Sequence, residues 1–142
     1  VFLDNAPSAS KQQGAVFVLT PTANDLTAWN SEVISATVTQ DFSSFGSAVS
    51  IAGREDGEAT HIVVGAWRVE GGKASSGAVY VFQRSAAAIW QQTLHLEPDA
   101  PAEEGKFGLA VSATTNYVFI VSVKEVDVMY APTPASMTQA TP

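Results

Sequence analysis

The stretch that decides the fold is Gly77-Ala78-Val79-Tyr80-Val81-Phe82. Successive side chains of a β-strand point to opposite faces, so Tyr80 and Phe82 share one face while Val79 and Val81 share the other. Both faces are apolar, and a strand of this kind is expected to be covered on both sides. The stretch therefore predicts a sheet that lies between two other sheets.

The same kind of stretch recurs along the chain with a spacing of 61 to 63 residues. The matching segments, in chain order, are residues 14–19 with 77–82, Trp29 with Trp90, Phe45-Gly46 with Phe107-Gly108, and residues 48–50 with 110–112. Matches in a fixed order at one spacing indicate an array of repeated units that cover one another's apolar faces.

Each complete unit is predicted to hold four short strands. Val, Ile, Phe and Tyr gather in short runs between clusters of Gly, Ser, Asp and Glu, which is the pattern of strands and turns. In the complete unit the predicted strands are residues 47–52, 61–67, 78–84 and 90–97. The connections are too short or too rich in glycine for crossover helices, so neighbouring strands are expected to be antiparallel.

The order of these motifs resembles the FG-GAP repeat of the integrin-type β-propeller, through Phe45-Gly46, Val64-Gly65-Ala66, residues 77–82 and Trp90. The resemblance implies an all-β fold built from antiparallel four-stranded meander blades of a β-propeller. Within such blades we expect glycine to provide a positive φ or a close approach of strands at Gly46, Gly65, Gly77 and Gly108. We expect large aromatic side chains to fill the space between blades at Trp29, Phe45, Trp90 and Phe107.

The repeat divides residues 1–130 into a partial unit (1–44), a full unit (45–106) and a second partial unit (107–130). Closed propellers use about four to eight blades, so the propeller is incomplete within this chain and would expose strand edges and an apolar face. We expect the missing cover to come from another chain, from further copies of this one, or from a three-sheet packing that buries the ends.

Residues 131–142 form a Pro/Thr/Ala-rich extended tail, expected to dock on a protein surface, with a glycosylated stalk as the alternative.

Composition limits the classes of partner. The chain has 14 Asp and Glu against 7 Lys and Arg, a net charge of −7, and no stretch gathers basic residues into a patch for phosphate groups. We therefore expect no nucleic acid and no anionic membrane surface as a partner. The apolar runs are far shorter than the roughly 20 residues that cross a bilayer, so no transmembrane segment is predicted. The sequence has no cysteine, which excludes disulfides and thiol nucleophiles.

No group of residues predicts catalysis, a metal site or a cofactor. Loop 53–61, where FG-GAP blades often carry a calcium site, has three acids without the required alternation, so a solvated hairpin is preferred. His61 and His95 are 34 positions apart without a further ligand, and no serine lies in a nucleophile motif. A second acidic group is interpreted as surface charge and consists of Glu97, Asp99, Glu103 and Glu104.

Trp67 stands where the family pattern usually has proline, at a strand end that leads into loop 68–76. A tryptophan on a blade rim beside Arg68 and Glu70 could stack on a sugar or anchor another chain, and a half-buried rim aromatic is the alternative. The candidate residues for partner or glycan binding are thus Trp67, Arg68 and Glu70, with Pro132 and Pro134 of the tail.

These observations predict a non-enzymatic structural or adaptor subunit that binds other protein chains, or further copies of itself, through blade edges, rim loops and the C-terminal tail. The alternative is a lectin-like, carbohydrate-binding propeller module completed by homo-oligomerisation. The resemblance implies an extracellular, cell-surface or organelle-lumen location. The first residue is Val1 rather than Met, which fits a processed chain or part of a longer one.

Overall fold

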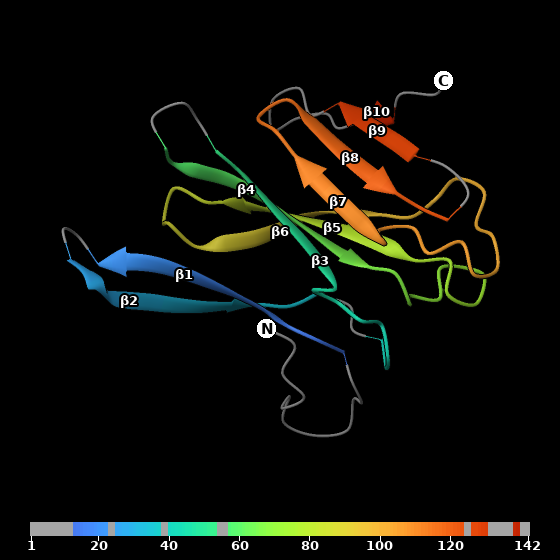
Figure 1. Ribbon diagram of the computed structural model, residues 1–142, viewed down its shortest axis with the longest axis horizontal. Coiled ribbons are helices and arrows are strands. Elements are labelled where there is room, and N and C mark those ends of the chain that lie inside the picture. Colours follow the sequence, from blue (N-terminus) through green and yellow to red (C-terminus); the bar gives the residue numbers. More distant parts are fainter. Residues whose placement is uncertain are drawn as a thin grey trace.

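The computed structural model describes residues 13–22, 25–37, 40–53, 57–123, 126–130 and 138–139. These residues contain no helix, and their strands form three antiparallel sheets (Figure 1). Sheet 1 consists of β1 (Val16–Thr22) and β2 (Asp25–Ile34). Sheet 2 consists of β3 (Ala48–Gly53), β4 (Ala59–Ala66), β5 (Ala78–Arg84) and β6 (Trp90–Leu96). Sheet 3 consists of β7 (Ala110–Ala113), β8 (Tyr117–Val121), β9 (Val126–Tyr130) and β10 (Thr138–Gln139).

Each four-stranded sheet is a meander, because every strand pairs with its neighbour in the sequence. The order is β3-β4-β5-β6 in sheet 2 and β7-β8-β9-β10 in sheet 3, and all the pairings are antiparallel. The predicted fold class, all-β with antiparallel meander blades, is confirmed. The predicted strands of the complete unit differ from β3 to β6 by at most two residues at their ends.

Sheet 2 lies between the other two sheets, and Figure 1 shows sheet 1 and sheet 3 on opposite sides of it. We name the face of each sheet that is turned toward the start of the chain its N-side face, and the opposite face its C-side face. Tyr80 and Phe82 on the N-side face of sheet 2 pack against Val16 of sheet 1. Val79 and Val81 on the C-side face pack with sheet 3. This arrangement confirms that residues 77–82 belong to a sheet covered on both sides.

No described sheet covers either end of this stack. Large apolar side chains are exposed on the N-side face of sheet 1, where Leu19 is 60% and Trp29 53% exposed, and on the outer face of sheet 3, where Phe119 is 36% exposed. Of the three sources of cover that the sequence leaves open, a three-sheet packing that buries the ends is not what the described residues show. Of the two tryptophans expected to fill the space between blades, Trp90 is buried against sheet 1, whereas no described sheet precedes Trp29.

Part of the proline-rich segment 131–142 belongs to sheet 3. Thr138 pairs with Tyr130 and Gln139 with Met129, so β10 adds a short fourth strand to the meander. The remaining residues of this segment, including Pro132 and Pro134, lie outside the described residues, as do residues 1–12.

Candidate partner-binding site

The Phe-Gly motif joins each sheet to the next by the same contact. The backbone N–H of Phe107 donates to the carbonyl oxygen of Ser76 (2.8 Å), and Phe107 forms a parallel bridge with Gly77. One repeat earlier, the N–H of Phe45 donates to the carbonyl oxygen of Gln13 (2.9 Å). Gly77 has a φ of +89°, and a Cβ there would collide with the backbone oxygen of Phe107, so this contact requires glycine.

Gly65 of the Val-Gly-Ala motif makes close backbone contacts both within its own repeat and with the next one. The N–H of Gly46 donates to the carbonyl oxygen of Gly65 (3.1 Å). A Cβ on Gly65 would collide with the backbone oxygen of Gly108, which belongs to the next repeat. Ala66 is fully buried in the cluster between sheets 1 and 2, and both motif phenylalanines are buried between sheets. These residues therefore determine how closely neighbouring sheets approach and how they are aligned with each other.

Trp67 lies in the turn directly after β4 and is half-buried. The Cζ atom of Arg68 is 4.7 Å from the centroid of its ring, and the Nζ atom of Lys106 is 5.3 Å from it. Cations at these distances are attracted to the ring by about 0.5–1 kcal/mol each at exposed sites. Lys106 also lies 3.6 Å from Glu104 and comes from the loop that leads into sheet 3, so this cluster joins the turn after β4 to that loop. Sequence reasoning found Trp67 and Arg68 but missed Lys106.

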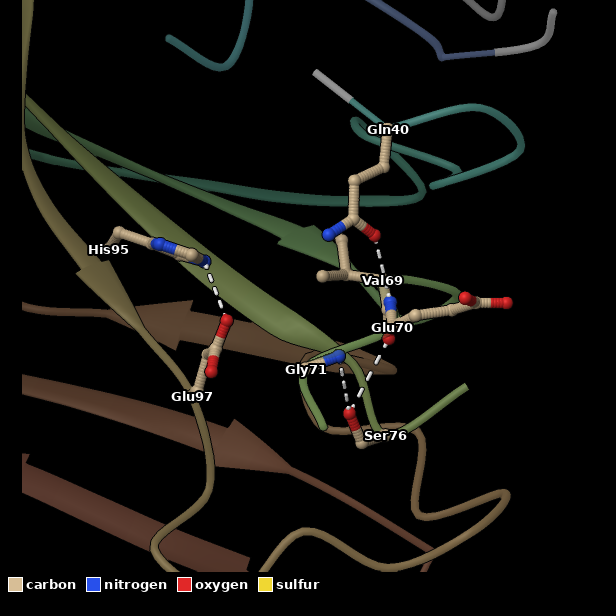
Figure 2. A network of polar contacts seen from close by, with 7 residues as sticks. All are labelled: Gln40, Val69, Glu70, Gly71, Ser76, His95 and Glu97. Atoms are coloured by element: carbon tan, nitrogen blue, oxygen red, sulfur yellow. Dashed lines mark hydrogen bonds and ion pairs between the residues drawn. The ribbon is translucent and has the colours of Figure 1, made fainter. Parts of the chain in front are cut away.

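Glu70 takes part in a different network from the one around Trp67. Its backbone N–H donates to Oε1 of Gln40 (2.9 Å), while Figure 2 shows its carboxylate pointing away from the pair formed by His95 and Glu97. In the same loop the hydroxyl of Ser76 accepts from the N–H of Gly71 (2.9 Å) and donates to the carbonyl oxygen of Val69 (3.5 Å) (Figure 2). Because Ser76 is fully buried and both of its roles are used within the loop, we assign it a structural function.

The two histidines have separate environments. His95 stacks on Tyr80 with ring centroids 4.7 Å apart, and its Nε2 atom lies 3.5 Å from Glu97. Burial, and secondly the charge of Glu97, raise the pKa of Tyr80, which keeps the phenol neutral. Burial lowers the pKa of His61, whose ring nitrogens contact the hydroxyl of Thr60 (2.8 Å) and the side-chain nitrogen of Gln83 (3.1 Å).

The part of the chain that the structure describes does not bring together the side chains that would bind a metal ion. No group of three or more His, Asp or Glu side chains gathers there, and Glu97, Asp99, Glu103 and Glu104 are all exposed. In the candidate calcium loop 53–61, residues 54–56 lie outside the described residues and Glu58 is exposed.

The uncovered N-side face of sheet 1 is a second candidate surface, which we name the N-side patch. It consists of Phe17, Leu19, Trp29 and Val33. The strand pairings place these residues on one face, since Phe17 is opposite Val33 and Trp29 is opposite Pro21. By the repeat spacing, the first three are the counterparts of Tyr80, Phe82 and Trp90 on the N-side face of sheet 2. The counterparts are 3%, 3% and 8% exposed, whereas the patch residues are 38%, 60% and 53% exposed.

Comparison with known proteins agrees with this geometry. A family model of the FG-GAP repeat matches residues 30–82, which run from β2 through most of β5 and contain the Phe45-Gly46 motif. No curated protein matches the chain in sequence. FG-GAP repeats are typically protein-interaction modules, are generally non-catalytic, and occur in extracellular and cell-surface proteins such as integrins. Among the described residues, no helix is long and apolar enough to cross a membrane. Residues 30–82 thus match an FG-GAP repeat, and the antiparallel meander sheets are consistent with incomplete β-propeller blades.

Proposed function

We propose that this chain is a non-enzymatic structural or adaptor module that binds protein chains through its uncovered sheet faces, with the rim at Trp67 as a second contact. The observation that carries the proposal is the N-side patch. Side chains in the same repeat positions are buried on sheet 2 and exposed on sheet 1. The family's usual role in protein interaction and its occurrence in extracellular and cell-surface proteins support the same proposal.

The patch has the chemistry of a protein interface rather than of a site for a charged ligand. None of Phe17, Leu19, Trp29 and Val33 carries a charge, and each is between 38% and 60% exposed. Full burial of a large apolar side chain contributes about 1.5–3 kcal/mol, so covering the exposed half of four such side chains would contribute about 3–6 kcal/mol. That amount supports association with an apolar protein surface once the entropy cost of binding is partly offset by other contacts.

The rim at Trp67 fits the polar border of such an interface. Tryptophan and arginine are the residue types that most often anchor protein partners. The alternative, a lectin-like module, requires a free face of Trp67 on which a sugar can stack. Arg68 and Lys106 both lie over this ring, so we favour a protein partner there.

The proposal is tested by native mass spectrometry of the full chain, recovered under mild conditions from cells that produce it. We expect the mass of this chain together with at least one further bound protein chain. Leu19→Glu places a charge in the N-side patch and should abolish the association. Thr20→Glu adds the same charge to the neighbouring, exposed position on the other face and serves as the matched control. A chain that carries no second protein chain, at every concentration and in the native material, would overturn the proposed function.

A further inference from the structure

We propose that the protein which covers the N-side patch is a second copy of this chain, packed head to tail with the outer face of its sheet 3 on the patch. This inference rests on the proposed function and names the partner of the same surface. It follows from the repeat, because the chain contains both halves of one interface.

The interface occurs twice inside the chain. The C-side face of sheet 1 packs on the N-side face of sheet 2, where Val16 and Ile34 meet Tyr80 and Phe82. The C-side face of sheet 2 packs in turn on the N-side face of sheet 3, with residues of both sheets in one buried cluster. An N-side face is therefore covered, in both cases, by the C-side face of a like sheet.

Sheets 1 and 2 each have their C-side face covered by the following sheet. Among the described sheets, sheet 3 is the one whose C-side face has no sheet against it. The strand pairing of Ser112 with Phe119 repeats the pairing of Ser50 with Val63 one unit earlier. Val63 is fully buried by sheet 3, whereas Phe119 is 36% exposed. We name this surface the C-side patch, and it consists of Tyr117, Phe119 and Val121.

A hydrogen bond also supports the equivalence between the C-side faces of sheet 2 and sheet 3. The hydroxyl of Ser50 accepts from the backbone N–H of Ala113 (2.9 Å) and so links sheet 2 to sheet 3. Ser112 has the corresponding position on sheet 3 and is exposed. The C-side patch thus presents both the apolar surface and the polar group that a following sheet would use.

One chain cannot join its own two patches, because sheet 2 separates sheet 1 from sheet 3 (Figure 1). A second copy brings them together, and the contact is heterologous, so successive copies form a ring or a chain of molecules. Neither patch contains a charged side chain, while each copy carries a net charge of −7. Repulsion between copies is screened by salt, so the association should strengthen as the salt concentration increases.

The test uses two blocked variants of the full chain, measured by analytical ultracentrifugation. Leu19→Glu blocks the N-side patch, and Phe119→Glu blocks the C-side patch. The wild-type chain should self-associate, and each variant alone should remain a monomer, because every contact needs one intact patch of each kind. An equimolar mixture of the two variants should form a dimer, since one variant supplies the intact N-side patch and the other the intact C-side patch. Thr20→Glu should associate like the wild type.

Each alternative outcome is distinct. A Phe119→Glu chain that still dimerises alone would show two N-side patches facing each other, and would overturn the head-to-tail contact. A wild-type chain that binds only a different protein would overturn this inference and leave the proposed function standing. A monomer that binds no protein would overturn both. Unchanged circular dichroism verifies the fold of each variant, and Ser112→Glu replaces Phe119→Glu if the latter unfolds.

Discussion

The two repeat-related tryptophans give the sharpest test of how the sheets cover one another. Trp90 is 8% exposed in the cluster between sheets 1 and 2, and Trp29 is 53% exposed on the N-side patch. A buried tryptophan removes roughly 200 Å² from water, which at about 25 cal/mol per Å² corresponds to about 5 kcal/mol for complete burial. Trp90→Ala should therefore reduce the free energy of unfolding by about 4–5 kcal/mol, and Trp29→Ala by about 2 kcal/mol.

The assay is urea unfolding at a protein concentration where ultracentrifugation shows a monomer. With a slope of about 2 kcal/mol per M of urea for a chain of this size, the unfolding midpoints of the two variants should differ by about 1 M. The physical reason is that both side chains occupy one repeat position, and only Trp90 has a sheet against it. Equal losses for the two variants, or a larger loss for Trp29→Ala, would refute the assignment of covered and uncovered faces.

Three further predictions concern the motif, pH and the rim. Gly77→Ala should lose more stability in thermal unfolding than Gly57→Ala, because both have a positive φ but only a Cβ at Gly77 meets backbone atoms; similar losses would contradict this. Burial lowers the pKa of His61 from 6.5, so the unfolded chain binds more protons below that pH. The contribution of His61 to the free energy of unfolding should be constant above pH 6.5 and should decrease as the pH falls below that value. His61→Gln should reduce this decrease, and a pH profile that the substitution leaves unchanged would contradict the prediction. Trp67→Ala should leave the circular dichroism spectrum intact but weaken partner binding about 10-fold, as measured by titration calorimetry; unchanged affinity would remove Trp67 from the site.

The sequence was sufficient for the strands and for their two-sided cover, because these depend on local patterns. The alternation in residues 77–82 has a period of two and shows directly that both faces are apolar. The matched spacing shows that neighbouring units are alike. Exposure was not predictable in the same way, because Trp29 and Trp90 occupy one repeat position and differ only in whether another sheet lies against them.

The contacts that sequence reasoning missed all depend on how loops fold. Lys106 lies over the ring of Trp67 although it comes from the distant loop that leads into sheet 3, and its φ of 54° is part of the tight turn before Phe107. Such a backbone conformation is uncommon outside glycine and leaves no signal in the sequence. The pairing of Thr138 and Gln139 in β10 is likewise absent from the composition of residues 131–142, which indicated only an extended chain.

The stability of the stack and its capacity to bind come from different parts of the molecule. Sheet 2 contains the fully buried residues Val63, Val79 and Val81, and the Phe-Gly contacts fix the sheets on either side of it. The end faces can therefore remain uncovered without loss of this core. Because the patches are apolar and the net charge is −7, attraction between faces and repulsion between whole molecules oppose each other. Such a balance allows ionic strength to control the addition of a further sheet, whereas the core itself stays nearly insensitive to salt.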